Sequence, residues 1–332
     1  MPPDLDSPFR LDSIYRRAVP GSKSKRESVA ELILTDFCSR RGIAVETLSS
    51  GLKTTIVAVS TPFQLYVESL DLVGISKSKN PVDGLLATLA YRAFTSVCGS
   101  LSLVATRQLQ EGEVVARAVV ESAVNALYIL QEDAESRLLQ FFFSYIDAER
   151  TQNQRWRRTL ATHDSVEALE HGKRIEQKAL ALDEYERFLG SLAAHANIAQ
   201  PSRAWPKIDR LFQAIGRELD YRTVYAALCS QSHHDAEDVL NRFFVDSFEN
   251  TEELSKRMRR EKHAFSLYMI LSAARYFLDN MEALGRRYDL MPVQSESQRA
   301  NSLVAAQIIE TIHNVDAGTF PKDWQGKLID GI

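Results

Sequence analysis

The sequence is poor in cysteine, in glycine and in long apolar stretches. Three cysteines and 14 glycines occur among 332 residues. The widely spaced cysteines form neither a disulfide framework nor a paired metal motif, and they are typical of a reducing compartment. Scarce glycine disfavours nucleotide-binding folds that need tight strand-to-helix turns. The longest uncharged stretches, Thr54 to Val67 and Ala93 to Thr106, are shorter than the roughly 20 residues that cross a bilayer.

Signatures of several enzyme classes are also missing. The sequence contains no glycine-rich phosphate loop, no Gly-x-Ser-x-Gly elbow, no Cys-x2-Cys pair and no His-Glu-x2-His motif. Its net charge of −4 argues against a generally basic surface that coats nucleic acid. The N-terminus carries Pro2, Asp4 and Asp6 where a signal peptide needs basic residues and an apolar run. We therefore expect a cytoplasmic protein without a cofactor, a bound metal or a membrane segment.

Apolar residues follow a helical period along most of the chain, and regular strand alternation is nearly absent. This pattern predicts an all-α fold, a helical bundle. Residues 52–60 form the one β-branched run, which fits a short strand or a helix. We favour the helix because a single strand has no evident partner. We expect a flexible segment at 1–27, an N-terminal helical subdomain at 28–80 and a bundle domain at 81–332.

Two polar helical segments within the bundle domain predict an antiparallel hairpin that projects from the core. The first begins near Asp133 and continues to about residue 162, and the second runs from Asp164 to a stop at Pro201. We expect a short helix after Trp205, which Gly216 ends.

Further helices are predicted on either side of these elements. Gly112 is expected to separate two helices that precede the hairpin. After the hairpin we expect one continuous helix from Asp220 to Phe248, and then the C-terminal helices of residues 251–315.

A charged pair lies in the most apolar predicted helix. Between Val114 and Leu130 nearly every side chain is apolar, and the exceptions include Arg117 and Glu121. A helix that is apolar on all sides is normally buried, and positions four apart lie one above the other. We therefore expect Arg117 and Glu121 to pair in the core. Burying charge costs several kcal/mol per ion unless it is paired and hydrogen-bonded, so this pair needs a structural or functional reason.

A second polar group lies about a hundred residues downstream. Tyr221, Tyr225, Cys229 and His233 are spaced by four, which makes a slowly drifting stripe along a helix. His234 lies on the side opposite Tyr225, so His233 is the histidine that we place with the tyrosines. Histidine changes its charge near neutral pH and is therefore suited to acid–base chemistry.

Three interpretations of these polar residues are open. In the first they form an active site, in which His233 acts as general acid or base and Arg117 stabilises an anion. In the second they form a buried hydrogen-bond network that fixes helix register. In the third His233 and Glu237 belong to a metal site, since their spacing suits metal ligands. The second interpretation needs the fewest assumptions, because nothing in the sequence names a reaction.

The same residues resemble a mostly bacterial family catalogued as domain of unknown function 5677. One element of the family pattern is Arg-x3-Glu in an apolar helix, here Arg117 and Glu121. Another is a Trp-Pro element before a short helix and a glycine, here Trp205-Pro206 and Gly216.

The third element of the pattern is Tyr-x3-Tyr-x2-Leu-Ser-x3-His, here Tyr221, Tyr225, Leu228, Cys229 and His233. The chain departs from it at Cys229, where the family usually has serine. The resemblance covers about residues 85–245 and implies an all-helical fold without supplying an activity.

A more distant similarity is to the HEPN group of helical ribonucleases, which carry an Arg, a polar residue and a His a few residues later. Arg158-Thr159 with His163 fits this pattern, and Arg257 with His263 fits it except for the polar residue. In those enzymes the Arg and His of two chains meet and cleave RNA without metal. By analogy, His233 and Arg117 are an alternative pair.

Two functional hypotheses follow from the sequence. The first is a HEPN-like, metal-independent ribonuclease, a toxin effector in bacterial defence, that acts on RNA through Arg117, Glu121, Tyr221, Tyr225 and His233. The second is a non-catalytic binding or assembly module, which forms a homodimer or binds a partner protein through the helical hairpin and in which the polar network is structural.

Overall fold

The computed structural model describes residues 23–72, 81–199, 202–231, 236–248 and 251–313. Throughout these ranges the regular structure is helical, which confirms the predicted all-α fold. None of the described helices is long and apolar enough to cross a membrane. Most of the predicted flexible segment lies outside the described residues, but its last part from Lys23 onward belongs to a helix.

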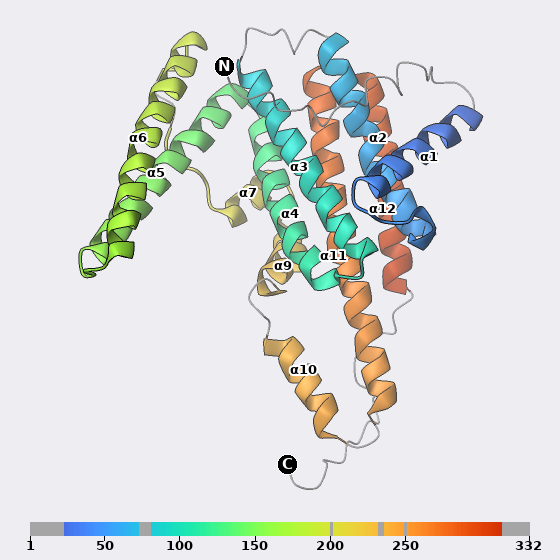
Figure 1. Cartoon of the computed structure of the whole chain (residues 1–332). Helices are drawn as coiled ribbons and strands as arrows, with labels where there is room; N and C mark the ends of the chain where they lie inside the picture. The colour runs from blue at the N-terminus through green and yellow to red at the C-terminus, as the bar shows by residue number, and fades with distance from the viewer. Residues whose placement is uncertain (1–22, 73–80, 200–201, 232–235, 249–250, 314–332) are drawn as a thin grey trace.

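The centre of the molecule is a bundle of long helices that lie side by side (Figure 1). They are α2 (Ser50–Leu72), α3 (Pro81–Ala105), α4 (Leu109–Gln131), α11 (Glu252–Arg287) and α12 (Met291–His313). Their buried faces share one core. Within it the rings of Phe63 and Phe94 stack at 4.0 Å and Phe277 packs against both. Helices from both ends of the chain therefore build the same hydrophobic core.

Helix α1 (Lys23–Ser39) and a short 3-10 helix, η2 (Val45–Thr47), pack beside α2. Residues 52–60 belong to α2, so the predicted helix at this β-branched run is confirmed. The helix contains Pro62 and continues past it. Ile56 and Val59 are three positions apart, which places them on one face of the helix, and the bundle covers both fully.

Gly112 lies inside α4, so the prediction that it separates two helices is wrong. A Cβ at this position would lie 2.9 Å from Cδ1 of Ile270 in α11. The hydroxyl of Ser100 in α3 also donates a 3.1 Å hydrogen bond to the Gly112 carbonyl. Here the glycine permits a close approach of three helices instead of ending one of them.

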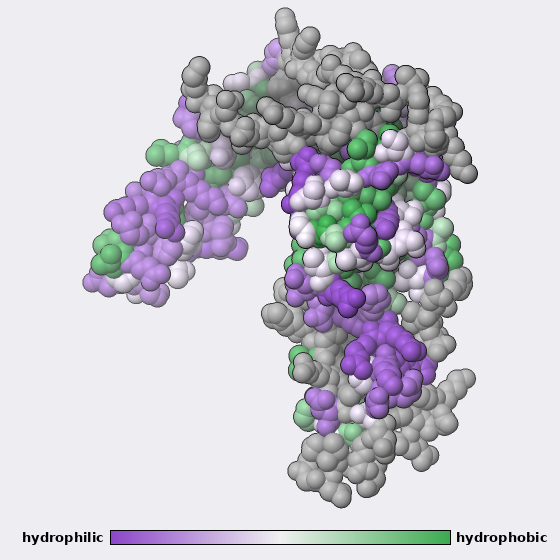
Figure 2. Space-filling model, turned by 45° about the vertical axis from the view of Figure 1, so that its right-hand side comes forward, coloured by the Kyte–Doolittle hydropathy of each residue, from purple (hydrophilic) through white to green (hydrophobic). Residues whose placement is uncertain are grey.

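Helices α5 (Ala134–Leu160) and α6 (Val166–His195) pair lengthwise and extend away from the bundle as one arm (Figure 1). The arm has a small core of its own, composed of Leu139, Phe143, Ile146, Leu182, Leu189, Leu192 and Ala193. Its surface is mostly hydrophilic, with hydrophobic side chains at the far end (Figure 2). Because the two helices bury apolar side chains against each other, their pairing does not depend on extensive contacts with the bundle.

The chain returns to α4 through a series of short elements: α7 (Ile208–Ala214), α8 (Glu218–Asp220), η4 (Tyr221–Tyr225), α9 (Ala226–Gln231) and α10 (Ala236–Ser247). Gly216, with a φ of 72°, ends the short helix as expected. The prediction of one regular helix from Asp220 to Phe248 is wrong at η4, which is a π-helix. Residues 232–235 of the predicted helix lie outside the described part.

Candidate functional site

One side of α4 presents a row of polar side chains to α7, η4 and α9. Arg117, Glu121 and Asn125 follow one another at a spacing of four, which places them along one face of the helix. The Asn125 side chain donates to the Glu121 carbonyl at 2.7 Å. It also accepts a 2.8 Å hydrogen bond from the indole nitrogen of Trp205. Asn125 thus links the segment before α7 to the polar row of α4 that contains Arg117 and Glu121.

The charged pair lies at the surface, so the prediction that Arg117 and Glu121 are buried in the core is wrong. Glu121 is exposed and Arg117 is partly exposed. The neighbouring positions Val120 and Val124 are fully buried against the bundle. The short elements α7, η4 and α9 cover only part of the outer face of α4, so some of its positions remain exposed. The apolar composition of α4 does not show which positions these are.

The tyrosine stripe forms a π-helical turn. The N–H of Ala226 donates to the carbonyl of Tyr221, five residues earlier. The wider turn lets the rings of Tyr221 and Tyr225 stack, with centroids 5.9 Å apart and planes 23° from parallel. Single π-helical turns occur frequently at functional sites.

Tyr225 is the member of this turn that reaches the charged row on α4. Its hydroxyl donates a hydrogen bond of 3.3 Å to Oε2 of Glu121. Only 7% of Tyr225 is exposed, and its ring packs 5.5 Å from that of Phe212 in α7. Burial, and then the negative charge of Glu121, raises the pKa of Tyr225 to about 12. The phenol is therefore neutral at physiological pH and is available as a hydrogen-bond donor.

Arg117 completes the group on the other side of Tyr225. Its guanidinium carbon lies 5.9 Å from the centroid of the Tyr225 ring. Burial works against the charge of this guanidinium, but a hydrogen bond with Tyr225, followed by the electrostatic effects of Cys229, Tyr225 and Glu121, raises the pKa of Arg117. The side chain remains a cation next to an exposed carboxylate, so the surface presents a fixed positive charge and a proton acceptor together.

The Trp-Pro element, Trp205-Pro206, packs next to this surface and holds the neighbouring helices together. The Trp205 ring meets Tyr128 of α4 edge to face at 5.3 Å and Phe141 of α5 at 5.1 Å. Gln131, near the end of α4, donates a 3.0 Å hydrogen bond to the Ala214 carbonyl at the end of α7. These contacts hold α7, and with it the ring of Phe212, in place against α4.

Residues 83–273 match the model of a family of unknown function, DUF5677. This range is more than half of the 332-residue chain. The chain belongs to this family. No curated protein and no solved structure matches it. The matched range contains Arg117, Glu121, the Trp-Pro element and the tyrosine turn, and it ends at Ala273 within α11, beyond the expected limit near residue 245.

His233 lies outside the described residues, so the position of the predicted acid–base group relative to Tyr225 is not given. The same holds for the side chain of Glu237, with which His233 was proposed to hold a metal. Within the described ranges no cluster of three or more His, Cys, Asp or Glu side chains is arranged to hold a metal ion.

The two HEPN-like segments belong to other elements than the charged row, the first to the end of α5 and the turn after it and the second to α11. In the first, Arg158 and His163 are exposed at the far end of the arm, where Nδ1 of His163 lies 3.0 Å from the Thr159 carbonyl. In the second, Arg257 lies 3.9 Å from Glu261 on its own helix and His263 is exposed.

A fully buried charge was missed by the sequence analysis. Glu113 has no exposed surface, accepts a short hydrogen bond from the Ser266 hydroxyl and lies 3.9 Å from Nζ of Lys262. It is four residues before Arg117 and therefore on a nearby part of α4. It lies next to Gly112, the point of close helix approach in the structure, and the sequence itself carries no signal of its burial.

A second missed network lies behind the tyrosine turn. Arg217 pairs with Asp279 at 2.5 Å and with Asp220 at 3.3 Å. The hydroxyl of Tyr276 donates to Asp220 at 2.8 Å, and Asn301 donates to Asp279 at 2.5 Å. Burial raises the pKa of Asp279, and the charge of Arg217 opposes that shift. This network joins α8, which leads directly into η4, to α11 and α12.

Proposed function

We propose that the chain is a metal-independent ribonuclease whose active site is the surface formed by Arg117, Glu121 and Tyr225, together with His233. The observation that carries the proposal is the placement of the neutral Tyr225 hydroxyl between a partly exposed guanidinium and an exposed carboxylate. An oriented cation and a proton acceptor at one surface are the groups that phosphodiester cleavage requires.

The reaction assigned to this surface is attack of a ribose 2′-hydroxyl on the adjacent phosphorus. Glu121 accepts the 2′-hydroxyl proton as the new P–O bond forms. Arg117 binds the nonbridging oxygens, on which negative charge increases in the transition state. The bond to the 5′-oxygen breaks, and this leaving group takes a proton from His233 in its imidazolium form. The products are a 2′,3′-cyclic phosphate and a free 5′-hydroxyl, so no oxidant or metal is needed.

Tyr225 has a positioning role in this scheme. Its pKa, raised to about 12 by burial and by the charge of Glu121, keeps the proton on the phenol, which then orients both charged side chains. The stacked Tyr221 ring and the ring of Phe212 hold Tyr225 in that orientation.

The test is cleavage of a fluorophore–quencher RNA by the purified full-length chain. Glu121→Gln and Arg117→Gln are each expected to reduce kcat/KM by about 10²–10³. Glu111→Gln, an exposed glutamate on the same helix, serves as the matched control and is expected to leave the rate unchanged. Each variant is compared with wild type by circular dichroism and thermal unfolding before its activity is measured. Equal rates for folded wild type and Glu121→Gln would refute the assignment.

Tyr225→Phe separates positioning from direct catalysis. Loss of a hydrogen bond to a charged group corresponds to a rate decrease of roughly 10- to 100-fold. The decrease should be the same from pH 6 to pH 9, because the phenol stays protonated throughout that range. Toxicity on expression, measured as growth and RNA integrity, is expected to follow the same order of variants if the chain acts as a toxin effector.

An assembly role is the second candidate, and the outer face of α6 favours it. Val166, Leu169, Leu180 and Phe188 are more than half exposed and fall on one side of that helix, opposite the face that packs on α5. Exposed apolar faces mark protein contacts. Light scattering of wild type and Phe188→Asp distinguishes this role, because a dimer formed through α6 dissociates in the variant while RNA cleavage is unaffected.

A further inference from the structure

A pocket of about 330 Å³ opens between the distal parts of α5 and α6, on the arm that projects from the bundle. Its lining residues come from both helices and are mostly polar: Gln152, Asn153, Arg155, Trp156, Thr159 and Lys178. The volume is within the range of roughly 300–1,000 Å³ that is usual for small-ligand sites. None of these residues belongs to the surface proposed above for RNA cleavage.

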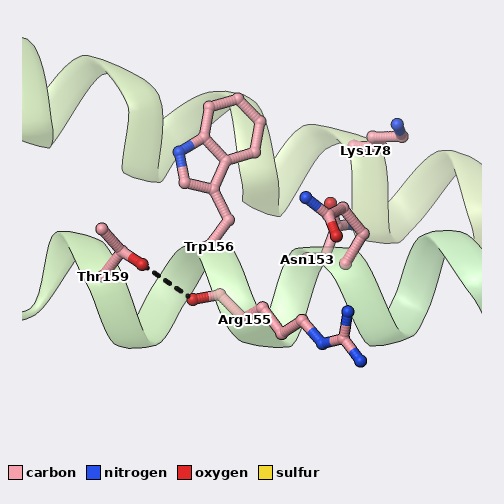
Figure 3. Close-up of a pocket in the computed structure, with 6 residues that line it drawn as sticks. Asn153, Arg155, Trp156, Thr159 and Lys178 are labelled. Carbon is pink, nitrogen blue, oxygen red and sulfur yellow. Dashed lines mark hydrogen bonds between the residues drawn. The ribbon is translucent and has the colours of Figure 1, made fainter. Parts of the chain in front are cut away.

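Trp156 supplies a planar apolar surface to this pocket. Its side chain rises from α5 towards α6 (Figure 3), where its ring lies 5.5 Å from that of His171. Its exposed fraction is 38%, which is large for a tryptophan between two helices. An indole that is open to solvent beside a pocket provides a stacking surface for another planar ring.

Asn153 supplies an unusual polar group. It is 5% exposed, and its Nδ2 atom is buried without a hydrogen bond to any part of the chain that the structure describes. Figure 3 places it next to Trp156, on the side of α5 that faces Lys178. Buried amides are normally hydrogen-bonded, and the exceptions need an explanation such as ligand binding. The amides of Asn153 and its neighbour Gln152 match the donors and acceptors on the edge of a nucleobase.

The charge around the pocket is positive, although the whole chain carries −4. Residues 150–163 contain four arginines and no acidic residue. Arg155, Arg157 and Arg158 are exposed, and none of them has an ion pair within the described ranges. Lys178 pairs with Glu149, so the arginines provide the excess charge. Figure 3 shows Arg155 extending along α5 at the rim, away from α6.

We propose that this pocket binds a nucleotide, either free or as one unit of a single-stranded RNA. The base stacks on Trp156, and its edge is hydrogen-bonded by the amides of Asn153 and Gln152. The phosphate lies at the rim near Arg155. Stacking on an aromatic ring combined with cationic contacts to phosphate is the general mode by which proteins bind unpaired bases.

The experiment measures binding to the full-length chain carrying Glu121→Gln, so that cleavage does not interfere. One arm uses a short fluorescein-labelled single-stranded RNA in fluorescence anisotropy, and the other uses adenosine monophosphate in calorimetry. Trp156→Leu is expected to weaken binding about tenfold, whereas Trp156→Phe retains most of the affinity. Tyr185→Leu, which removes an exposed aromatic ring elsewhere on the arm, is the matched control. RNA binding without monophosphate binding identifies the strand as the ligand, and binding of both identifies the nucleotide unit.

Two further variants separate the pocket from general electrostatic attraction. Arg155→Gln should reduce the salt dependence of RNA binding by about one ion, while Arg92→Gln on α3 leaves it unchanged. Asn153→Leu replaces the amide with an apolar group of similar shape, so it should weaken binding while thermal stability is kept or raised. Two results would overturn the proposal: no RNA binding at low salt, or equal RNA binding by the Glu121→Gln chain with and without Trp156→Leu.

Discussion

The hydroxyl of Tyr276 donates a 2.8 Å hydrogen bond to Asp220, the residue directly before the π-helical turn. This contact joins α11 to the end of α8, from which the turn that carries Tyr225 begins. Tyr276 is 2% exposed, and its ring also packs edge to face with that of Phe212 at 6.0 Å. The orientation of the candidate site is therefore linked to the bundle core through a tyrosine that water does not reach.

Alkaline pH should destabilise the protein through this tyrosine. Burial, and then the hydrogen bond to Asp220, raises the pKa of Tyr276 above its ordinary value, which is about 10. The unfolded chain therefore loses this proton first, and stability that is complete below pH 10 decreases as the pH rises further. Tyr66 and Tyr288 act in the same direction.

Urea unfolding at several pH values measures this effect. Tyr276→Phe should lower the free energy of unfolding at pH 7 by about 1.5–3 kcal/mol, because a hydrogen bond to a carboxylate is lost. Above pH 10 the variant should lose stability less steeply than wild type. Parallel curves for the two proteins would contradict the proposed cause.

The buried carboxylate of Glu113 should depend on its serine partner. Ser266→Ala removes a hydrogen bond to a charged group, so the free energy of unfolding is expected to fall by about 1.5–3 kcal/mol. Ser297→Ala is the matched control, since Ser297 is equally buried but bonds only to the Val293 carbonyl of its own helix. A similar loss in both variants would show that burial of the hydroxyl, and not its bond to Glu113, determines the effect.

Two glycines should respond to alanine in opposite ways. A Cβ on Gly285 would lie 2.8 Å from Cγ and 3.1 Å from the backbone nitrogen of Gln294, so the turn between α11 and α12 must shift. We expect Gly285→Ala to destabilise the fold by about 1–3 kcal/mol. Gly190 in α6 has no atom within 4 Å of that position, so Gly190→Ala should stabilise it by about 0.5–1 kcal/mol. Chemical denaturation measures the free energy of unfolding of the two variants. A change in the same direction for both would contradict the prediction.

The base of the arm should loosen in acid. Arg203 donates to both carboxylate oxygens of Asp147, at 2.7 and 2.6 Å, and to Glu186 at 2.6 Å. The bond from Arg203 is the main cause that lowers the pKa of Asp147, and bonds from Arg150 and then Arg203 lower that of Glu186. Their stabilisation is present above the unfolded pKa values, about 4, and is lost as pH falls through the lower folded values.

Amide hydrogen exchange of α5 and α6 reports on this loosening. Protection factors in the arm should be lower at pH 3 than at pH 6, with little change in the bundle. Arg203→Gln at pH 6 should resemble wild type at pH 3, whereas Arg210→Gln, which removes an exposed arginine of α7, should not. Uniform loss of protection in the bundle and the arm would contradict a local effect.

The helical period was sufficient to predict the fold class and most of the helices. It failed at Gly112 because the sequence does not record that Ile270 approaches within contact distance. It failed again between Asp220 and Phe248, since a π-helical turn has no composition of its own and depends on the packing of Tyr221, Tyr225 and Phe212.

The meeting of the two polar segments was predictable from the sequence, and the burial of their side chains was not. The spacing of Arg117 and Glu121 and the spacing of the tyrosines were enough to suggest that the two segments meet, and the contact between Tyr225 and Glu121 joins them. Composition could not distinguish which side of α4 is covered by short elements. For the same reason the sequence pointed to Arg117 and Glu121 as buried charges, while the charge that is fully enclosed is Glu113.

The π-helical turn makes the site sensitive to the length of the chain. Its ladder accommodates one residue more than an α-helix does between Tyr221 and Ala226. Deleting one of the residues between Tyr221 and Tyr225 would restore regular α-helical bonding and leave the orientation of the following helix nearly unchanged. The two tyrosines would then be three positions apart in a narrower turn, so the stacking of their rings that the wider turn permits would be lost. A one-residue, in-frame deletion would thus disturb the candidate site without removing any residue that composes it.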